Sequence, residues 1–167
     1  MYIVDRLFDT DELDPIDIVE TLATHYDWDF DRITDDKIAV SIEGRWRTYA
    51  VTLAWTEVDE TLKIASSFYM KPPRDKLSNL NEALNIANNK CWTGAFVFLP
   101  KQNLMIFRYA INLIGGACAS AAQIDSMLEN AILACERFYP AFQLTCWGEE
   151  TPEQSMSIAF DQTYGQA

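Results

Sequence analysis

His25 is the single histidine of this 167-residue chain, so it is the first residue to test for catalysis. Histidine is the commonest general base and metal ligand, and in a nucleophilic site it works beside a serine or a cysteine. His25 has no serine or cysteine nearby in the sequence. It ends a predicted helix, where a cation near the helix C-terminus is mildly favourable. We therefore interpret His25 as structural and expect no catalytic residue.

Three aspartates, Asp27, Asp29 and Asp31, have the spacing of the first oxygen ligands in a calcium loop. The pattern then fails, because Arg32 stands where the loop needs glycine and Ile38 stands where it needs glutamate. Alternation with aromatic residues is more typical of an amphipathic edge strand. We expect no metal and no cofactor.

Gly115 and Gly116 precede a predicted helix, as glycines do in anion-binding loops. They lack the lysine of a phosphate-binding loop and the glycine spacing of a dinucleotide site. We interpret them as a turn that lets the helix pack closely on the sheet.

The chain is acidic, with 25 acidic and 13 basic side chains and a formal net charge of −12. Arg45 and Arg47 flank Trp46 and could support stacking on bases, but this charge opposes contact with phosphates or an anionic membrane. Residues 1–36 hold 12 acids and 2 bases, residues 37–108 hold 6 and 10, and residues 109–167 hold 7 and 1. This polarity could guide self-association or attract a basic partner. We expect neither nucleic acid nor membrane as a partner.

The four cysteines form no C-x-x-C pair and lie among apolar neighbours, so we predict buried, reduced and structural thiols. They are Cys91, Cys118, Cys135 and Cys146. The sequence from Met1 to Arg6 lacks the pattern of a secretory signal. The longest charge-free run, 109–124, is too polar and too short to span a bilayer. These observations favour a cytoplasmic protein.

The periodicity of apolar residues predicts one domain over residues 1–167. Asp14-Pro15 starts a helix, and alternating residues from 28 to 70 predict three or four strands with short connections. Pro72-Pro73 opens a second helix that extends to Cys91. A hairpin of residues 95–99 and 104–110 follows, and its near-continuous apolarity suggests central strands covered on both faces.

Two capping boxes, Ser120 to Gln123 and Thr151 to Gln154, predict the starts of the last two helices. Pro140 lies within the first of these helices and is expected to bend or end it. The predicted order is α-β-β-β(-β)-α-β-β-α-α. Segregated strands and helices indicate an α+β fold with an antiparallel β-sheet and helices packed on it.

Three stretches of the chain resemble the YbjN family of bacterial sensory transduction regulators. The most specific is Glu136-Arg-Phe-Tyr-Pro140 within residues 133–143, which continues to Trp147-Gly148. The others are residues 68–72, which lead into an asparagine-rich helix, and residues 91–96, which enter the hairpin. An acidic helix followed by Trp28 is similar too, so the resemblance covers residues 12–162.

The resemblance implies a fold like that of the type III secretion chaperones, which is a curved antiparallel sheet with helices and is commonly dimeric. The family provides no established catalytic residue and no cofactor. We therefore expect a non-enzymatic regulator or adaptor that acts through an unknown protein partner and forms a homodimer. One alternative is a sensor that holds a small apolar ligand between helices and sheet. A further alternative, an unrecognised enzyme, is disfavoured by the lone histidine.

Two sets of residues are candidates for partner binding. Ile18, Leu22 and Tyr26 of the first helix offer apolar anchors for an extended segment beside a sheet edge. Asp17 and Glu20 would favour a basic peptide. These anchors could instead fill the chain's own core, and the aspartates at 27, 29 and 31 could keep the edge unpaired.

A second apolar surface is predicted on the third helix, opposite its main apolar stripe. Leu133, Pro140 and Leu144 form it and could contact a second copy of the chain. Alternatively, the last helix could cover this surface with its own apolar residues, Met156, Ala159 and Phe160.

Overall fold

The structure is a computed structural model that describes residues 14–164. The expectation about a secretory signal concerns Met1 to Arg6, which lie outside the described residues. Within the described range the predicted order of elements is confirmed, with four strands between the first two helices. The elements are α1 (Pro15–His25), β1 (Asp29–Thr34), β2 (Lys37–Glu43), β3 (Thr48–Thr56), β4 (Thr61–Tyr69), the 3-10 turn η2 (Arg74–Lys76), α2 (Leu77–Lys90), β5 (Ala95–Leu99), β6 (Leu104–Asn112), α3 (Ala121–Trp147) and α4 (Pro152–Tyr164).

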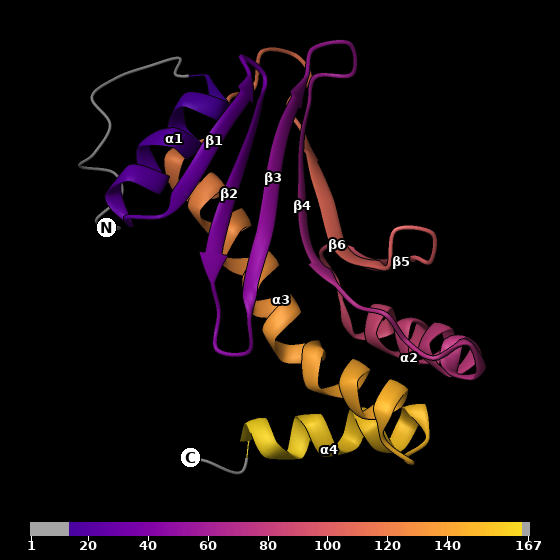
Figure 1. Ribbon diagram of the computed structural model, residues 1–167. Helices are drawn as coiled ribbons and strands as arrows, with labels where there is room; N and C mark the ends of the chain where they lie inside the picture. Colours follow the sequence, from indigo (N-terminus) through magenta and orange to yellow (C-terminus); the bar gives the residue numbers. More distant parts are fainter. Residues whose placement is uncertain (1–13, 165–167) are drawn as a thin grey trace.

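One antiparallel sheet contains all six strands of the described range, in the order β1-β2-β3-β4-β6-β5 (Figure 1). This arrangement confirms the α+β fold. The hairpin folds back, so β6 pairs with β4 and β5 becomes an edge strand. The prediction of two central strands covered on both faces is therefore wrong. Arg108 and Ala110 of β6 are exposed on the side away from the helices.

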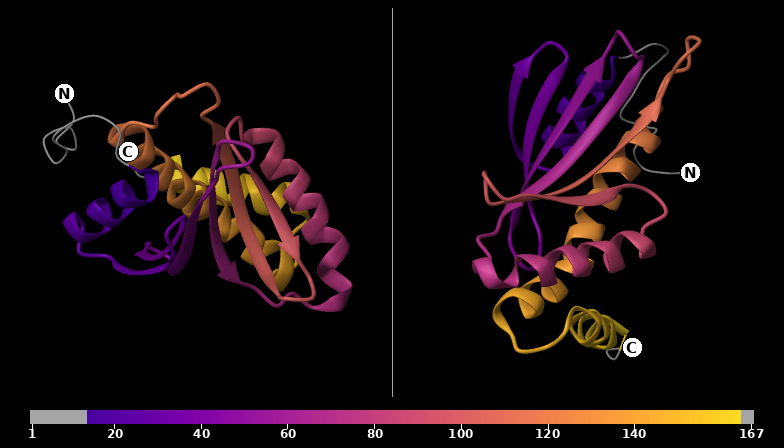
Figure 2. Two further views of the ribbon diagram at one scale, coloured as in Figure 1. Left: turned by 90° about the horizontal axis from the view of Figure 1, so that it is seen from above. Right: turned by 90° about the vertical axis from the view of Figure 1, so that its right-hand side faces the viewer.

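The helices cover one face of the sheet and leave the other face open (Figures 1 and 2). In Figure 1, α3 passes behind β2 and β3 and α1 lies beside β1, and none of the helices in residues 14–164 lies on the near face of β2 and β3. Helix α1 packs on the first part of α3, whereas α2 and α4 pack near the end of α3. The long helix α3 therefore connects two groups of elements across the covered face.

Alternating residues of the central strands build the core under α3. The inward side chains are almost fully buried because every second residue of a strand points to the same face. On β2, β3 and β4 they are Ile38, Val40, Ile42, Tyr49, Val51, Leu53, Leu62, Ile64 and Phe68. The buried polar residue Ser66 lies among them and accepts a hydrogen bond from the Cys135 thiol at 3.4 Å.

Local capping signals start the helices as predicted. The Asp14 carboxylate accepts a hydrogen bond from the Ile16 amide at 2.8 Å. Ser120 and Gln123 form both bonds of a capping box, at 2.8 and 3.1 Å. Thr151 and Gln154 form the same pair of bonds, at 3.0 and 3.2 Å. These contacts satisfy amide groups that have no partner in the first helical turn.

Pro140 does not end the third helix, because α3 continues through it to Trp147. The proline removes one backbone hydrogen bond and crowds the preceding turn, which costs about 3 kcal/mol in a straight helix. Phe138 and Phe142, on either side of Pro140, are almost fully buried. Their burial offsets that cost, so the helix does not end at Pro140. A bend at this residue, the other outcome that the sequence predicts, stays a prediction.

Gly115 and Gly116 are needed for their backbone conformation and not for close packing. Their φ angles are 80° and 76°, in the left-handed region that favours glycine. A Cβ atom added at either position would meet no atom within 4 Å. The interpretation that these glycines let the helix approach the sheet is therefore wrong.

The Glu136 carboxylate of α3 binds the turn between β2 and β3. It accepts hydrogen bonds from the backbone amides of Arg45 and Trp46, at 2.8 and 3.3 Å. It also accepts one from the buried Tyr49 hydroxyl at 2.5 Å. A Cβ atom at Gly44 would come within 2.4 Å of this carboxylate, so glycine leaves room for the contact.

The side-chain amide of Asn88 covers part of the free edge of β5. It accepts a hydrogen bond from the Phe96 amide at 2.6 Å and donates one to the Phe96 carbonyl at 3.0 Å. The Asn88 side chain therefore replaces one residue of a neighbouring strand. An edge strand needs such protection because its unpaired backbone groups can bind other chains.

We predict that Glu136→Ala lowers the free energy of unfolding by about 3 kcal/mol, since it leaves the buried Tyr49 hydroxyl without an acceptor. Glu136→Gln retains an acceptor oxygen and should lose less. Glu129→Ala removes an exposed carboxylate from the same helix and should change stability by less than about 0.5 kcal/mol. Urea unfolding measures all three variants. Equal stability of the Glu136→Ala and Glu129→Ala proteins would contradict the assignment.

We also predict that Asn88→Ala lowers the free energy of unfolding by about 1–3 kcal/mol, because two backbone groups of Phe96 lose their partner. Asn85→Ala is the matched control, since it makes the same change at an exposed position of the same helix. The control corrects for the higher helix propensity of alanine. Chemical denaturation of both variants tests the prediction, which fails if they are equally stable.

Candidate functional site

An apolar groove with an acidic rim lies where α1 ends, β1 begins and the first part of α3 passes. Its volume is about 300 Å³. Two of its lining residues, Asp125 and Glu129, are carboxylates one helical turn apart on α3. The other lining residues are apolar or aromatic: Tyr26, Trp28, Ile42, Leu128, Ile132 and Leu133. The groove therefore combines an apolar floor with negative charge on one side.

The turn after α1 brings two aromatic rings together in this groove. Asp27 has a φ of 56°, in the left-handed region that aspartate tolerates better than most residues. The Trp28 amide donates to the Ala23 carbonyl at 2.9 Å, which closes the turn. The Tyr26 and Trp28 rings stack with their centroids 4.7 Å apart. This stack forms one wall of the groove.

The Tyr26 hydroxyl joins this wall to the acidic rim. It donates a hydrogen bond to the Asp125 carboxylate at 3.3 Å. Partial burial, followed by the negative charges of Asp125 and Glu129, raises the pKa of Tyr26 above its usual value. The hydroxyl therefore stays protonated at neutral pH. The groove is suited to an apolar group that carries or neighbours a positive charge.

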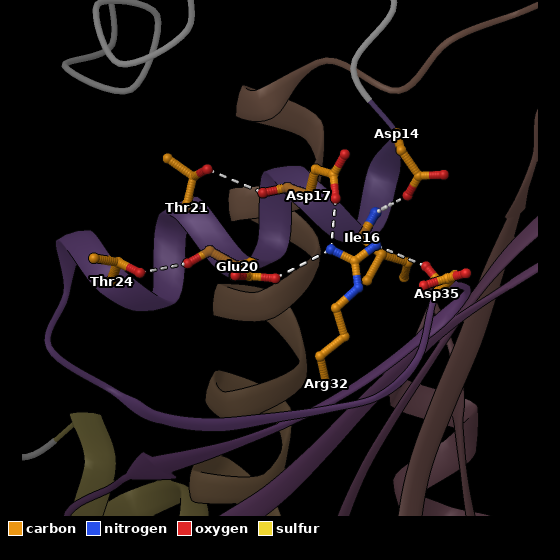
Figure 3. Close-up of polar contacts among 8 residues, drawn as sticks. All are labelled: Asp14, Ile16, Asp17, Glu20, Thr21, Thr24, Arg32 and Asp35. Carbon is orange, nitrogen blue, oxygen red and sulfur yellow. Dashed lines mark hydrogen bonds and ion pairs between the residues drawn. The ribbon is translucent and has the colours of Figure 1, made fainter.

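Arg32 of β1 holds α1 in its position beside the groove (Figure 3). Its guanidinium pairs with Asp17 at 2.5 Å and with Glu20 at 3.1 Å, and it donates to the Asp35 carbonyl at 2.8 Å. The two α1 carboxylates that we expected to favour a basic peptide therefore already bind a cation of the chain itself. The acidic residues that line the groove belong to α3.

The structure separates the predicted anchors of α1. Ile18 and Leu22 are 4% and 0% exposed, since they face the core, so they are not available as anchors in this structure. Tyr26 is 40% exposed and lines the groove. Leu133, from the predicted surface of α3, is 56% exposed and lines the same groove. Two residues that were assigned to different surfaces therefore meet at one site.

The last helix does not cover Leu133. Met156 and Ala159 of α4 are buried, and the Phe160 ring packs against Phe138 with centroids 5.5 Å apart. The other two residues of the predicted surface, Pro140 and Leu144, are half-buried.

Most of the groove is not apparent from the sequence. Trp28 stands at the start of the alternation that predicts the first strand, and Leu128 is almost fully buried. The available signal was the pair Asp125 and Glu129, four residues apart on the helix and next to apolar residues. Only the fold shows that this pair faces Tyr26.

The three aspartates with calcium-loop spacing lie at the start of the sheet. Asp29 and Asp31 are exposed on β1, while Asp27 lies in the preceding turn. Residues 14–164 contain no group of three or more His, Cys, Asp or Glu that could hold a metal ion. His25 ends α1, as predicted. No helix in this part of the chain is long and apolar enough to cross a membrane.

The cysteines are not all buried as predicted. Cys135 and Cys146 are buried, and desolvation raises their pKa to about 12 and about 11. Cys91 is half-buried, and burial raises its pKa as well. Cys118 is exposed in the segment between β6 and α3, so the prediction is wrong for this residue.

We predict that Cys118 alone reacts quickly with a thiol reagent at pH 8 in the folded protein. Cys135 and Cys146 are inaccessible and remain protonated at this pH, and only the thiolate reacts. Their labelling should become fast after unfolding, or as the pH approaches their pKa values near 11–12. Peptide mass spectrometry after timed labelling identifies the modified residue. Labelling of Cys135 at the rate of Cys118 would disprove this assignment.

Comparisons with known proteins agree with this fold. The YbjN family model, described as "Putative bacterial sensory transduction regulator", matches residues 15–144. The crystal structure of YbjN from E. coli is similar to this structure, with a TM-score of 0.53 and 8% sequence identity, over 90% of this chain and 93% of that chain. No curated protein matches the sequence. Because the family model matches most of this chain, the chain belongs to the YbjN family.

Proposed function

We propose that this YbjN-family chain is a regulator that acts by binding a protein partner and not by catalysis. The groove beside Tyr26 carries the proposal, since apolar side chains lie exposed there next to two carboxylates. Exposed apolar patches with a polar rim are typical of protein-interaction sites. The description of the family as a sensory transduction regulator supports the regulatory role.

The partner is best accommodated as an extended segment along β1. Within residues 14–164 no other strand lies beyond β1 in the sheet, and β1 starts directly after Trp28 of the groove. A segment that pairs with an edge strand gains backbone hydrogen bonds, and its side chains can then enter a neighbouring pocket. At the opposite edge, Asn88 already occupies backbone groups of β5. The β1 edge is therefore the more open of the two.

The charges around this site favour a basic segment. Asp125 and Glu129 line the groove, and Asp29 and Asp31 are exposed on the adjacent edge strand, on the face of β1 away from the helices. Such charges can also prevent edge strands from pairing with one another. A basic segment would neutralise them, whereas an acidic or neutral segment would not. The acidic charges therefore oppose pairing with another acidic edge strand and favour a basic segment.

A small apolar ligand is less well accommodated than a peptide. The volume of about 300 Å³ is at the lower end of small-molecule sites, which span about 300–1,000 Å³. The carboxylates at the rim also disfavour a ligand without positive charge. The four free cysteines support a reducing compartment, such as the cytoplasm, as the place of action.

We predict that a photoreactive benzoylphenylalanine at position 133 cross-links a partner in extracts of the native host. The same group at Val58 is the control, because this residue is 98% exposed and absent from the groove lining. Tyr26→Ala in the position-133 protein should reduce cross-linking about tenfold, since tyrosines are frequent anchors of interfaces. Leu22→Ala tests whether Leu22 is a core residue or a partner anchor. As a core residue it should lower the stability of the protein when replaced, without changing partner capture by the folded fraction.

The mass of the cross-linked product separates the possible occupants. A heterologous product at position 133, lost with Tyr26→Ala, supports the proposal. A product of twice the chain mass assigns the groove to a homodimer instead. Equal products at positions 133 and 58, or none at either, overturn the proposal. Native mass spectrometry of the purified chain tests the small-ligand alternative directly.

A further inference from the structure

The open face of the sheet has an unusual composition for a face that contacts water. Solvent-facing positions of antiparallel strands are commonly polar. Here the strand register places Ala54 between Lys37 and Lys63, and Ala110 next to Lys63. In the adjacent row Ala65 lies between Thr52 and Arg108. Small side chains therefore form the floor, and longer cationic ones surround it.

This composition creates a shallow depression of about 490 Å³ over β3, β4 and β6. The depression exists because alanines stand beside lysine and arginine side chains that project farther from the sheet. Its lining residues come from β2, β3, β4 and β6: Lys37, Thr52, Ala54, Lys63, Ile64, Ala65, Arg108, Tyr109 and Ala110. It lies on the face opposite α1 and α3, so it is separate from the groove beside Tyr26.

Every charged residue that lines the depression is a cation. Lys63 pairs with Asp59 at 3.0 Å. In residues 14–164 no ion pair joins Lys37 or Arg108 to an acid. A local excess of positive charge in a chain with a net charge of −12 is complementary to an acidic partner.

We propose that this face is a second docking surface and that it binds an acidic amphipathic helix of a partner protein. The central strands β3 and β4 already use their backbone groups to pair with neighbours on both sides. An extended peptide lying on them would leave its own backbone groups without partners against the alanines. A helix satisfies its backbone internally, so its apolar side can cover the alanines while its carboxylates reach Lys37 and Arg108. This inference goes beyond the proposed function, because it concerns the other face and a partner of opposite charge.

The test uses a synthetic 18-residue amphipathic helix with leucine and alanine on one side and glutamate on the other. The full chain is titrated with this peptide in NMR and fluorescence-anisotropy experiments. We expect chemical-shift changes at Thr52, Ala65 and Arg108 and binding that weakens with salt. Lys37→Glu/Arg108→Glu should weaken binding at least about tenfold, because two attractive contacts become repulsive. Lys71→Glu/Lys101→Glu makes the same charge change at exposed positions outside the depression and should change the affinity less than about twofold.

A second pair of variants tests the shape without changing the charge. Ala65→Gln fills the depression, whereas Ala39→Gln makes the same change on the same face but outside the lining. Only the first should weaken the peptide. Circular dichroism and thermal unfolding confirm that each variant is folded before its affinity is compared. Tyr26→Ala should not affect this peptide, so failure of the groove and failure of the open face give different results.

Three outcomes would overturn this inference. The glutamate peptide could bind no better than a matched peptide with lysine in its place. Its chemical-shift changes could map to the groove beside Tyr26. Finally, sedimentation could show a dimer of the unmodified chain that the Lys37→Glu/Arg108→Glu variant loses, which would assign the face to a second copy.

Discussion

The Glu136 carboxylate fixes where α3 lies on the sheet, and the positions of both proposed surfaces follow from that contact. It binds the two amides of the β2–β3 turn and the buried Tyr49 hydroxyl, while the buried Phe138 holds the other side of the helix. Burial and the hydrogen bond to Glu136 both raise the pKa of Tyr49, so its hydroxyl remains a donor. This contact gives a physical reason for the motif at residues 136–140, since its first residue joins a helix to a distant hairpin.

Once α3 is fixed, its first part must pass the end of α1, where the groove forms. Arg32 determines the other side of the groove, because it holds Asp17 and Glu20 of α1 against β1. Helix α3 also covers a single face of the sheet, so in the described part of the chain no helix covers the alanines on the opposite face. Both surfaces therefore follow from the packing of α3 on one face of the sheet.

Signals that act over a few residues could be read from the sequence. The capping boxes at Ser120 and Thr151, the start at Asp14 and the alternation of the strands gave the order of elements, because each depends on nearby residues. The continuation of α3 past Pro140 and the edge position of β5 could not be read in this way. Packing of Phe138 and Phe142 decides the first, and the pairing of β6 with β4 decides the second. The candidate site shows the same limit, since the apolar stripe of α1 does not reveal that Leu22 is buried while Tyr26 is exposed.

The net charge of −12 conceals a separation of charge that only the fold reveals. Asp125 and Glu129 line the groove, while the mildly basic middle of the chain supplies Lys37, Lys63 and Arg108 to the depression on the open face. Under the two proposals, a partner that suits one surface is repelled by the other, so each surface would select a different charge. Because salt screens exposed charges within about 10 Å at 0.1 M, this selection acts mainly on segments that make close contact. A chain with two such surfaces can hold a basic and an acidic partner at the same time, on opposite faces of one sheet.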